Sequence, residues 1–184
     1  MTDDLISSST AKARLVVTMP PTPSKLSSAL EQDIASNYVT FTRTTDAFTH
    51  IAASAAQRLI IMIPFIDRVG ADWALDLFEQ TPALERILIL RDAGQLTSCG
   101  KAGARLQNAV SRVIDYGGTD AEQETFHAKI VLADGVMAYV GSANLLRRSK
   151  TTNLECGILL EGPAVHSVKV LTEAVIRMAD GSKI

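Results

Sequence analysis

Residues 125–144 read TFHAKIVLADGVMAYVGSAN, a stretch in which charged residues interrupt two apolar runs. Apolar residues alternate and then merge over Phe126–Ala133, which is typical of a strand with at least one buried face. Asp134-Gly135 is a strong hairpin-turn signal, and Met137–Val140 follows as the return strand. The stretch therefore predicts two antiparallel strands joined by a tight turn.

On either side of this hairpin the chain alternates between strand and helix patterns. Short apolar runs predict buried strands at Leu59–Pro64, Arg86–Leu90, Val113–Asp115 and Leu154–Leu160. Helical spacing predicts helices after Ser24, over Asp46–Gln57, Asp72–Phe78 and Gly100–Val110, and after Pro163. This alternation predicts an α/β fold with a mixed β-sheet flanked by helices.

The N-terminal segment differs in composition from the rest of the chain. Residues 1–24 hold a Ser/Thr run and three prolines, so they read as a flexible N-terminal tail that precedes a domain over residues 25–184. A length of 184 residues agrees with one domain and a tail. One alternative stays open, because Leu15–Val17 is apolar enough to pack as an edge strand.

Composition excludes several classes of protein. Apolar residues make up 47% and charged residues 21%, which excludes disorder, collagen and coiled coil as the main state. The net charge of -2 excludes a generally basic nucleic-acid coat, so an anion-binding surface has to be local. With two cysteines, no signal-peptide pattern and no long apolar run, we expect a soluble cytoplasmic protein.

Two basic side chains stand out in the first strand of the hairpin. Strand alternation puts His127 and Lys129 on one side of the chain, where a core strand would carry apolar residues. The ammonium disfavours protonation of the imidazole, and such a pair is suited to holding an anion such as phosphate. After the return strand, Ser142 and Asn144 supply polar groups, and Glu155 is placed to accept a hydrogen bond from the second ring nitrogen.

These residues follow a known pattern. The pattern resembles the HKD signature of the phospholipase D superfamily, which reads His, any residue, Lys, four residues, Asp, six residues, Gly-Ser-any-Asn. Its positions are filled by His127, Lys129, Asp134, Gly141, Ser142 and Asn144, and the acidic residue that trails the signature falls on Glu155. The resemblance implies a phospholipase D-like layered domain with one motif in the chain.

The resemblance also implies a role for each residue. His127 attacks phosphorus and forms a phosphohistidine intermediate, which divides one displacement into two easier ones. Lys129 and Asn144 bind the non-bridging phosphate oxygens, assisted by Ser142, and Glu155 orients the imidazole. Asp134 and Gly141 are expected to be structural. The scheme needs no metal or other cofactor, and the sequence holds no metal-ligand cluster.

Active sites of this family use two such motifs, whereas this chain has one. His50 and His166 do not begin a second His-any-Lys and are expected to be ordinary helix residues. We therefore expect a homodimer in which two copies of His127 meet across a two-fold axis. This arrangement resembles the single-motif, Nuc-like nucleases of bacteria and related restriction or phage-defence phosphodiesterases.

The substrate is less directly encoded. Arg147, Arg148 and Lys150 follow Asn144 closely enough to contact phosphates that flank the scissile one, although a basic loop can also be only a solvated surface. The leading hypothesis is a metal-independent nuclease that cleaves DNA or RNA. Two alternatives stay open: a phosphodiesterase that acts on a phospholipid, and a catalytically quiet nucleic-acid-binding or assembly subunit of a larger defence or repair complex.

Overall fold

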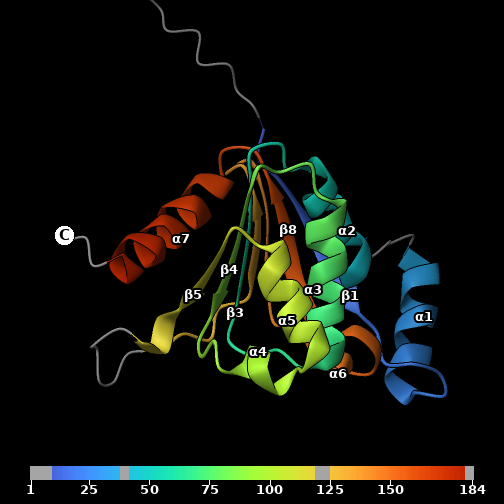
Figure 1. The fold of residues 1–184 in the computed structure, drawn as a ribbon. Coiled ribbons are helices and arrows are strands. Elements are labelled where there is room, and N and C mark those ends of the chain that lie inside the picture. Colours follow the sequence, from blue (N-terminus) through green and yellow to red (C-terminus); the bar gives the residue numbers. More distant parts are fainter. Residues whose placement is uncertain (1–9, 38–41, 119–124, 181–184) are drawn as a thin grey trace, which may run out of the picture.

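The computed structural model describes residues 10–37, 42–118 and 125–180, which form an eight-stranded sheet with helices on both faces (Figure 1). The strands are β1 (Lys12–Thr18), β2 (Thr42–Arg43), β3 (Arg58–Ile63), β4 (Glu85–Leu90), β5 (Arg112–Asp115), β6 (Ile130–Ala133), β7 (Met137–Gly141) and β8 (Glu155–Glu161). The helices are α1 (Lys25–Asn37), α2 (Thr44–Ser54), α3 (Arg68–Gln80), α4 (Gln95–Ser98), α5 (Lys101–Ala109), α6 (Arg147–Thr151) and α7 (Val165–Ala179), with a 3-10 turn at Tyr116–Gly118.

The strand order determines which loops meet. The order is β2-β1-β8-β7-β6-β3-β4-β5. β3, β4 and β5 run parallel, and β2 runs parallel to β1. The pairs β3–β6, β6–β7, β7–β8 and β8–β1 are antiparallel. The ends of β3, β4 and β7 therefore lie at one edge of the sheet, together with the starts of β6 and β8. Loops at the carboxyl ends of parallel strands are the usual place for a site in an open α/β sheet.

Two apolar layers hold the sheet. On one face α2, α3 and α5 cover the alternate strand residues, and the Phe48 ring stacks on Trp73 at 5.0 Å and meets Tyr139 edge-on at 4.9 Å. On the other face Ile60, Ile87 and Leu132 pack in a second cluster that also contains residues of α7. Because β3 and β4 are covered on both sides, their sequences are almost wholly apolar, as expected for central parallel strands.

The mixed α/β fold and the predicted hairpin are confirmed. β6 and β7 pair antiparallel, and the turn residues Asp134 and Gly135 have φ values of 51° and 71°. Positive φ at both central positions is the geometry of a tight hairpin turn that aspartate and glycine tolerate. The first strand is shorter than predicted, since it begins at Ile130, and residues 125–129 approach the sheet without regular secondary structure.

The expectation of a flexible tail was wrong for part of residues 1–24. Lys12–Thr18 forms β1, which pairs antiparallel with β8 along its whole length and parallel with β2 at Val16 and Val17. The open alternative of an Leu15–Val17 strand is nearer to the structure. Only Val16 and Val17 of β1 are buried, so the strand depends on a partner far away in sequence and leaves little local pattern. Residues 1–9 lie outside the described residues.

Candidate active site

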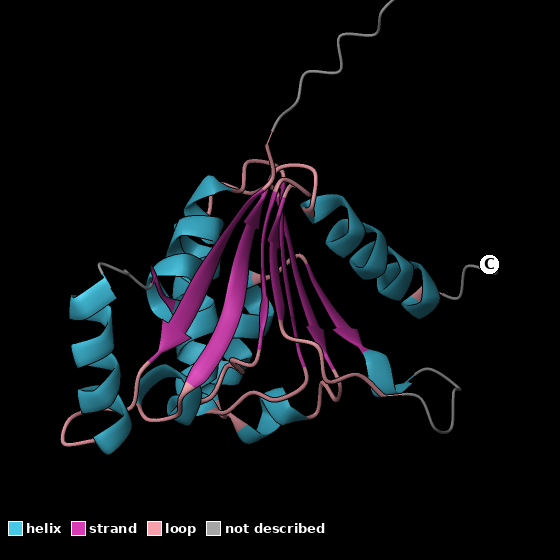
Figure 2. Ribbon diagram, turned by 180° about the vertical axis from the view of Figure 1, so that it is seen from behind, coloured by secondary structure: helices cyan, strands magenta, loops and turns pink. Residues whose placement is uncertain are grey.

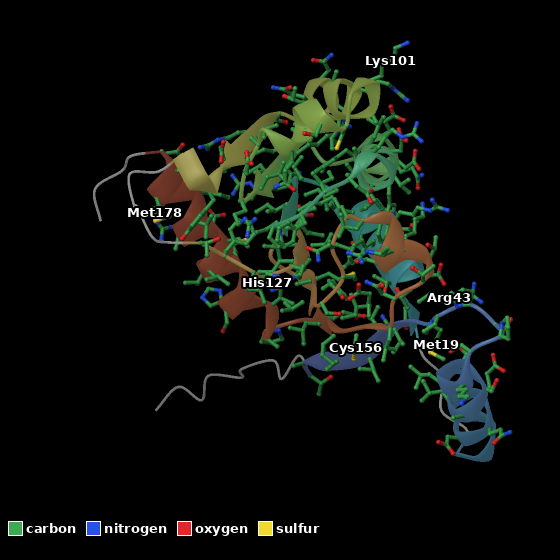
Figure 3. The ribbon with its side chains drawn as sticks, turned by 90° about the horizontal axis from the view of Figure 1, so that it is seen from below. Met19, Arg43, Lys101, His127, Cys156 and Met178 are labelled. Carbon is green, nitrogen blue, oxygen red and sulfur yellow. The ribbon has the colours of Figure 1, made fainter. Side chains whose placement is uncertain are left out.

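His127 and Lys129 lie together at the edge where β3 ends and β6 begins (Figure 3, seen from below). The Lys129 Nζ is 2.8 Å from Nδ1 and 3.3 Å from Nε2 of His127, and it donates to the His127 carbonyl at 2.6 Å. The ammonium can only donate, so the role of each ring nitrogen depends on which tautomer the imidazole adopts. The two side chains thus share one side of the chain, as expected, although they precede the strand.

The two members of this pair differ in exposure. The His127 side chain is exposed, whereas Lys129 is only 4% exposed. Burial lowers the pKa of Lys129, because desolvation disfavours its charged form, and the charge of Glu155 opposes this effect. The pair therefore consists of a solvent-exposed imidazole and a buried lysine side chain.

Glu155 is the centre of a buried hydrogen-bond network. Its Oε2 accepts from the Ser142 hydroxyl at 2.5 Å, and its Oε1 accepts from Ser149 Oγ at 2.7 Å and Asn153 Nδ2 at 3.1 Å. The residue is 6% exposed, and hydrogen bonds are what a buried carboxylate requires. Among the described residues the imidazole of His127 is not one of its donors, so the expected contact between Glu155 and the ring of the same chain is absent here.

Ser149 and Asn153 were not singled out from the sequence. Ser149 is a buried residue of α6, and its hydroxyl also accepts the backbone N–H of Asn144 at 3.3 Å. The Ser142 hydroxyl accepts the N–H of Cys156 at 3.0 Å. Glu155 therefore ties the segment after β7 to the start of β8. Single polar residues such as Ser149 and Asn153 give no sequence signal for such a role, because they can equally well face solvent.

The glycine and the asparagine of the motif are each explained by different contacts. A Cβ at Gly141 would lie 2.3 Å from the Tyr139 hydroxyl and 2.6 Å from the Cα of Gly157, so glycine lets β7 and β8 close around the tyrosine. That hydroxyl accepts the Ala143 N–H at 3.3 Å, and burial raises the pKa of Tyr139 to about 12. In Asn144 the Oδ1 atom is buried with no hydrogen-bond partner in the described residues, so it is able to receive a hydrogen bond from a water molecule or a ligand.

Asp134 lies in the β6–β7 turn, at the opposite edge of the sheet from His127. Its carboxylate accepts three backbone N–H groups, from Ala56 at 2.7 Å, Gln57 at 3.0 Å and Arg58 at 2.7 Å. Desolvation raises the pKa of this carboxyl, but the three hydrogen bonds outweigh it and the pKa is lowered. These contacts agree with the expected structural role of Asp134.

The basic residues after Asn144 do not form one surface. Arg148 is exposed and borders the same pocket as Asn144, whereas the Lys150 Nζ lies 5.3 Å from the centre of the Trp73 ring and borders a different pocket, beside β1. The Arg147 backbone N–H donates to Asp67, and its side chain is exposed. Among the three, Arg148 has the position that suits a flanking phosphate.

Some residues outside the motif differ from expectation or were missed. Strand alternation points Cys156 to the opposite face from Glu155, which predicts a packed thiol, but Cys156 is exposed. The ring of Phe65, which follows β3, lies 5.9 Å from the imidazole of His127 at 71°, and Arg91 lies over it. Its only sequence signal is its place at the carboxyl end of a buried strand.

The described residues contain neither a metal-binding cluster nor a membrane-spanning helix. No group of three or more His, Cys, Asp or Glu side chains there is arranged to hold a metal ion. Within the same residues no helix has both the length and the apolar character needed to span a membrane.

Comparison with known proteins agrees with this geometry. A family model described as cardiolipin synthase, PLD-like domain, matches residues 6–176. No curated protein sequence matches the chain. Two solved structures similar over nearly their whole length are the phospholipase D family member Nuc from Salmonella typhimurium (TM-score 0.54, 14% identity, 89% of this chain and 91% of that one) and NucT from Helicobacter pylori (TM-score 0.57, 16% identity, 93% and 97%).

A larger protein is also similar in fold. Phosphatidylserine synthase from Haemophilus influenzae has a TM-score of 0.55 and 14% identity, with 92% of this chain covered and 39% of that one, so this chain spans well under half of that protein's length. The family model extends over most of the chain and includes the whole His127–Glu155 segment. The chain therefore belongs to the phospholipase D superfamily of phosphodiesterase-type enzymes.

Proposed function

We propose that the protein is a metal-independent nuclease that cleaves DNA or RNA through a phosphohistidine intermediate in a homodimeric active site. The observation that carries the proposal is the exposed imidazole of His127 against the buried ammonium of Lys129. Ser142 and Asn144 follow the neighbouring strand β7 at the same edge of the sheet. A nucleophile beside groups that stabilise negative charge is what phosphoryl transfer requires.

In the first step Nε2 of His127 forms a bond to phosphorus, and the bond from phosphorus to the leaving oxygen breaks. The leaving oxygen takes a proton from the partner's His127. For Nε2 to attack, its lone pair must be free, so the ring proton must sit on Nδ1. A substrate phosphate favours this tautomer because its oxygens attract the ammonium of Lys129 away from Nδ1, which lies 2.8 Å from that ammonium in the free chain.

In the second step a water molecule gives a proton to the partner's His127 and attacks phosphorus, which breaks the phosphorus–nitrogen bond and restores His127. Lys129 and Asn144 neutralise the non-bridging oxygens in both steps. Glu155 acts on this site by holding the segment that carries Ser142 and Asn144, since its three donors come from that segment. It is a positioning residue in this scheme.

The dimer is supported by an uncovered part of the sheet. On the face of the sheet that carries α7, this helix packs between β7 and β5 and leaves β1 and β8 uncovered (Figure 2). Leu15 of β1 and Ile158 of β8 pair across these two strands and are 39% and 37% exposed. Cys156 is exposed on the same side of β8, near the edge that carries His127 (Figure 3). A second copy on this face would bring two His127 residues toward one another and bury these apolar side chains.

Nucleic acid is the favoured substrate for two reasons. Arg148 borders the pocket that contains Asn144, which supports a contact between its guanidinium and a phosphate next to the scissile one. The chain also covers almost all of Nuc and NucT, but under half of the phosphatidylserine synthase. We also propose that the protein acts in phage defence or restriction, a role that requires the nuclease activity.

The test is cleavage of single- and double-stranded DNA and RNA by purified protein in excess EDTA. We expect activity in the wild type, none in His127→Ala, and wild-type activity in His50→Ala, the matched removal of an exposed histidine on α2. A phospholipid in detergent micelles serves as the competing substrate. Turnover in His127→Ala contradicts the covalent mechanism, and cleavage of the phospholipid alone contradicts the nuclease assignment.

A further inference from the structure

The aromatic ring of Phe65 is not used by the mechanism above. It is half-buried at the edge of the sheet that carries the site, with its centroid 5.9 Å from that of the His127 ring. The guanidinium carbon of Arg91, which follows β4, lies 4.4 Å from the centre of the Phe65 ring. Arg91 occupies one face of the ring, and an aromatic ring next to a phosphate-binding group is able to stack a nucleobase on its other face.

The segment that carries Phe65 is held rigidly. The Gln95 side chain donates to the carbonyl of Pro64 at 3.0 Å and accepts the N–H of Ile66 at 3.1 Å, so both neighbours of Phe65 are fixed. Ile66 also forms a bridge with Leu145, immediately after Asn144. Ile66 and Leu145 are buried. The position of the Phe65 ring relative to Asn144 is therefore set before any substrate binds, which lowers the entropy cost of stacking.

A pocket of ≈ 440 Å³ joins this ring to the phosphate-binding residues. It is lined by Phe65, Asn144 and Arg148, together with Ile66, Gln95, Leu146, Ser149 and Asn153. Its size lies within the range of small-ligand sites, roughly 300–1,000 Å³. One end is aromatic, another carries the asparagine proposed to bind the scissile phosphate, and the exposed Arg148 is cationic.

We propose that this pocket is the subsite for the nucleoside attached to the scissile phosphate, with its base stacked on Phe65. The proposal rests on the nuclease function and names the residue that recognises the base. Both donors of the Gln95 amide are used, toward Pro64 and Asp92, and its oxygen is used by Ile66. Gln95 therefore has no free N–H for a base edge, and stacking on Phe65 by itself does not select among unpaired bases.

The test compares a thymidine dinucleotide with the same compound lacking one base, on either side of the phosphate. In the wild type, loss of the stacked base should lower kcat/KM about 10- to 100-fold, the size of one base–aromatic stack. In Phe65→Leu, which keeps an apolar side chain without a π-face, this ratio should fall to about 1, and Phe65→Tyr should restore it. Leu84→Ala, at an exposed apolar residue lining the pocket beside the β6–β7 turn, is the control that keeps the wild-type ratio.

A second measurement separates this inference from the nuclease function. Binding of labelled oligothymidylate is measured by fluorescence anisotropy in the His127→Ala background, with and without Phe65→Leu. A 10-fold or greater loss of affinity with Phe65→Leu supports the subsite even if no dinucleotide is cleaved. Equal affinity, or the same base dependence in Phe65→Leu as in the wild type, overturns it. Cleavage with no base dependence leaves the nuclease function standing and removes the subsite.

Discussion

Replacement of Asp134 by alanine should destabilise the fold without removing the active-site groups. The carboxylate accepts the backbone N–H groups of Ala56, Gln57 and Arg58, and so joins the β6–β7 turn to the start of β3. Ala56 and Gln57 are exposed, so water can replace the carboxylate there, and the lost energy comes mainly from the half-buried Arg58 N–H. A hydrogen bond to a charged group contributes about 1.5–3 kcal/mol.

The backbone adds a second cost. Asp134 has a φ of 51°, in the left-handed region that aspartate and asparagine tolerate better than alanine, for which it costs about 1–2 kcal/mol. Asp134→Ala should therefore lower the free energy of unfolding by about 3–5 kcal/mol, a large part of the 5–15 kcal/mol typical of a domain. Asp134→Asn keeps the backbone preference and one acceptor, so about half of that loss is expected.

The assay is urea denaturation followed by circular dichroism, with cleavage measured at a temperature where each variant is folded. The lowered pKa of Asp134 adds a pH dependence. Its contribution should be complete above the ordinary carboxyl pKa of about 3.9 and lost as the pH falls through the lowered native pKa. A folded Asp134→Ala without nuclease activity, or one as stable as the wild type, refutes this reasoning.

Three further predictions follow from the site and the uncovered sheet face. Because burial lowers the pKa of Lys129, the cleavage rate should begin to fall at a pH below the ordinary lysine pKa of about 10.4. Lys129→Arg should move this alkaline fall to higher pH, and a fall that does not move must be caused by another group. Ser149→Ala leaves Glu155 with one donor fewer and should lower the free energy of unfolding by about 1–3 kcal/mol in urea denaturation, whereas an unchanged value denies the network. Ile158→Lys should raise the dimer Kd at least about 100-fold in analytical ultracentrifugation and abolish cleavage, because an unpaired charge is costly to bury. The control Val170→Lys, at an exposed residue of α7, should change neither property, and an Ile158→Lys variant that stays dimeric places the interface elsewhere.

The hairpin and the motif were readable from the sequence because their determinants are local. The turn needs only two residues that tolerate positive φ, and the paired strands are the segments directly before and after it in the chain. The spacing from His127 to Asn144 spans one hairpin, so the register of β6 and β7 brings both ends of the motif to one edge. Central strands β3 and β4 were also predictable, because burial on both faces requires an unbroken apolar run.

Other features depend on contacts between distant parts of the chain. β1 pairs with β8 across most of the sequence length, so two buried valines could not reveal it as a strand. In the sequence, Ser149 and Asn153 are ordinary polar residues. In the folded chain they donate hydrogen bonds to the Glu155 carboxylate, which makes none with His127 among the described residues.

The family, the hairpin and the residues of the motif could be predicted from the sequence alone, since each rests on residue types at short, regular spacing. The groups that surround the motif depend on how the sheet and helices pack. The sheet order sets Phe65 and Arg91 beside the motif, since β3 pairs with β4 and β6. The packing of α6 puts Arg148 at the pocket that contains Asn144, and Lys150 near the ring of Trp73. Such neighbours come from the packing of strands and helices remote in sequence, where no local pattern constrains the choice of residue.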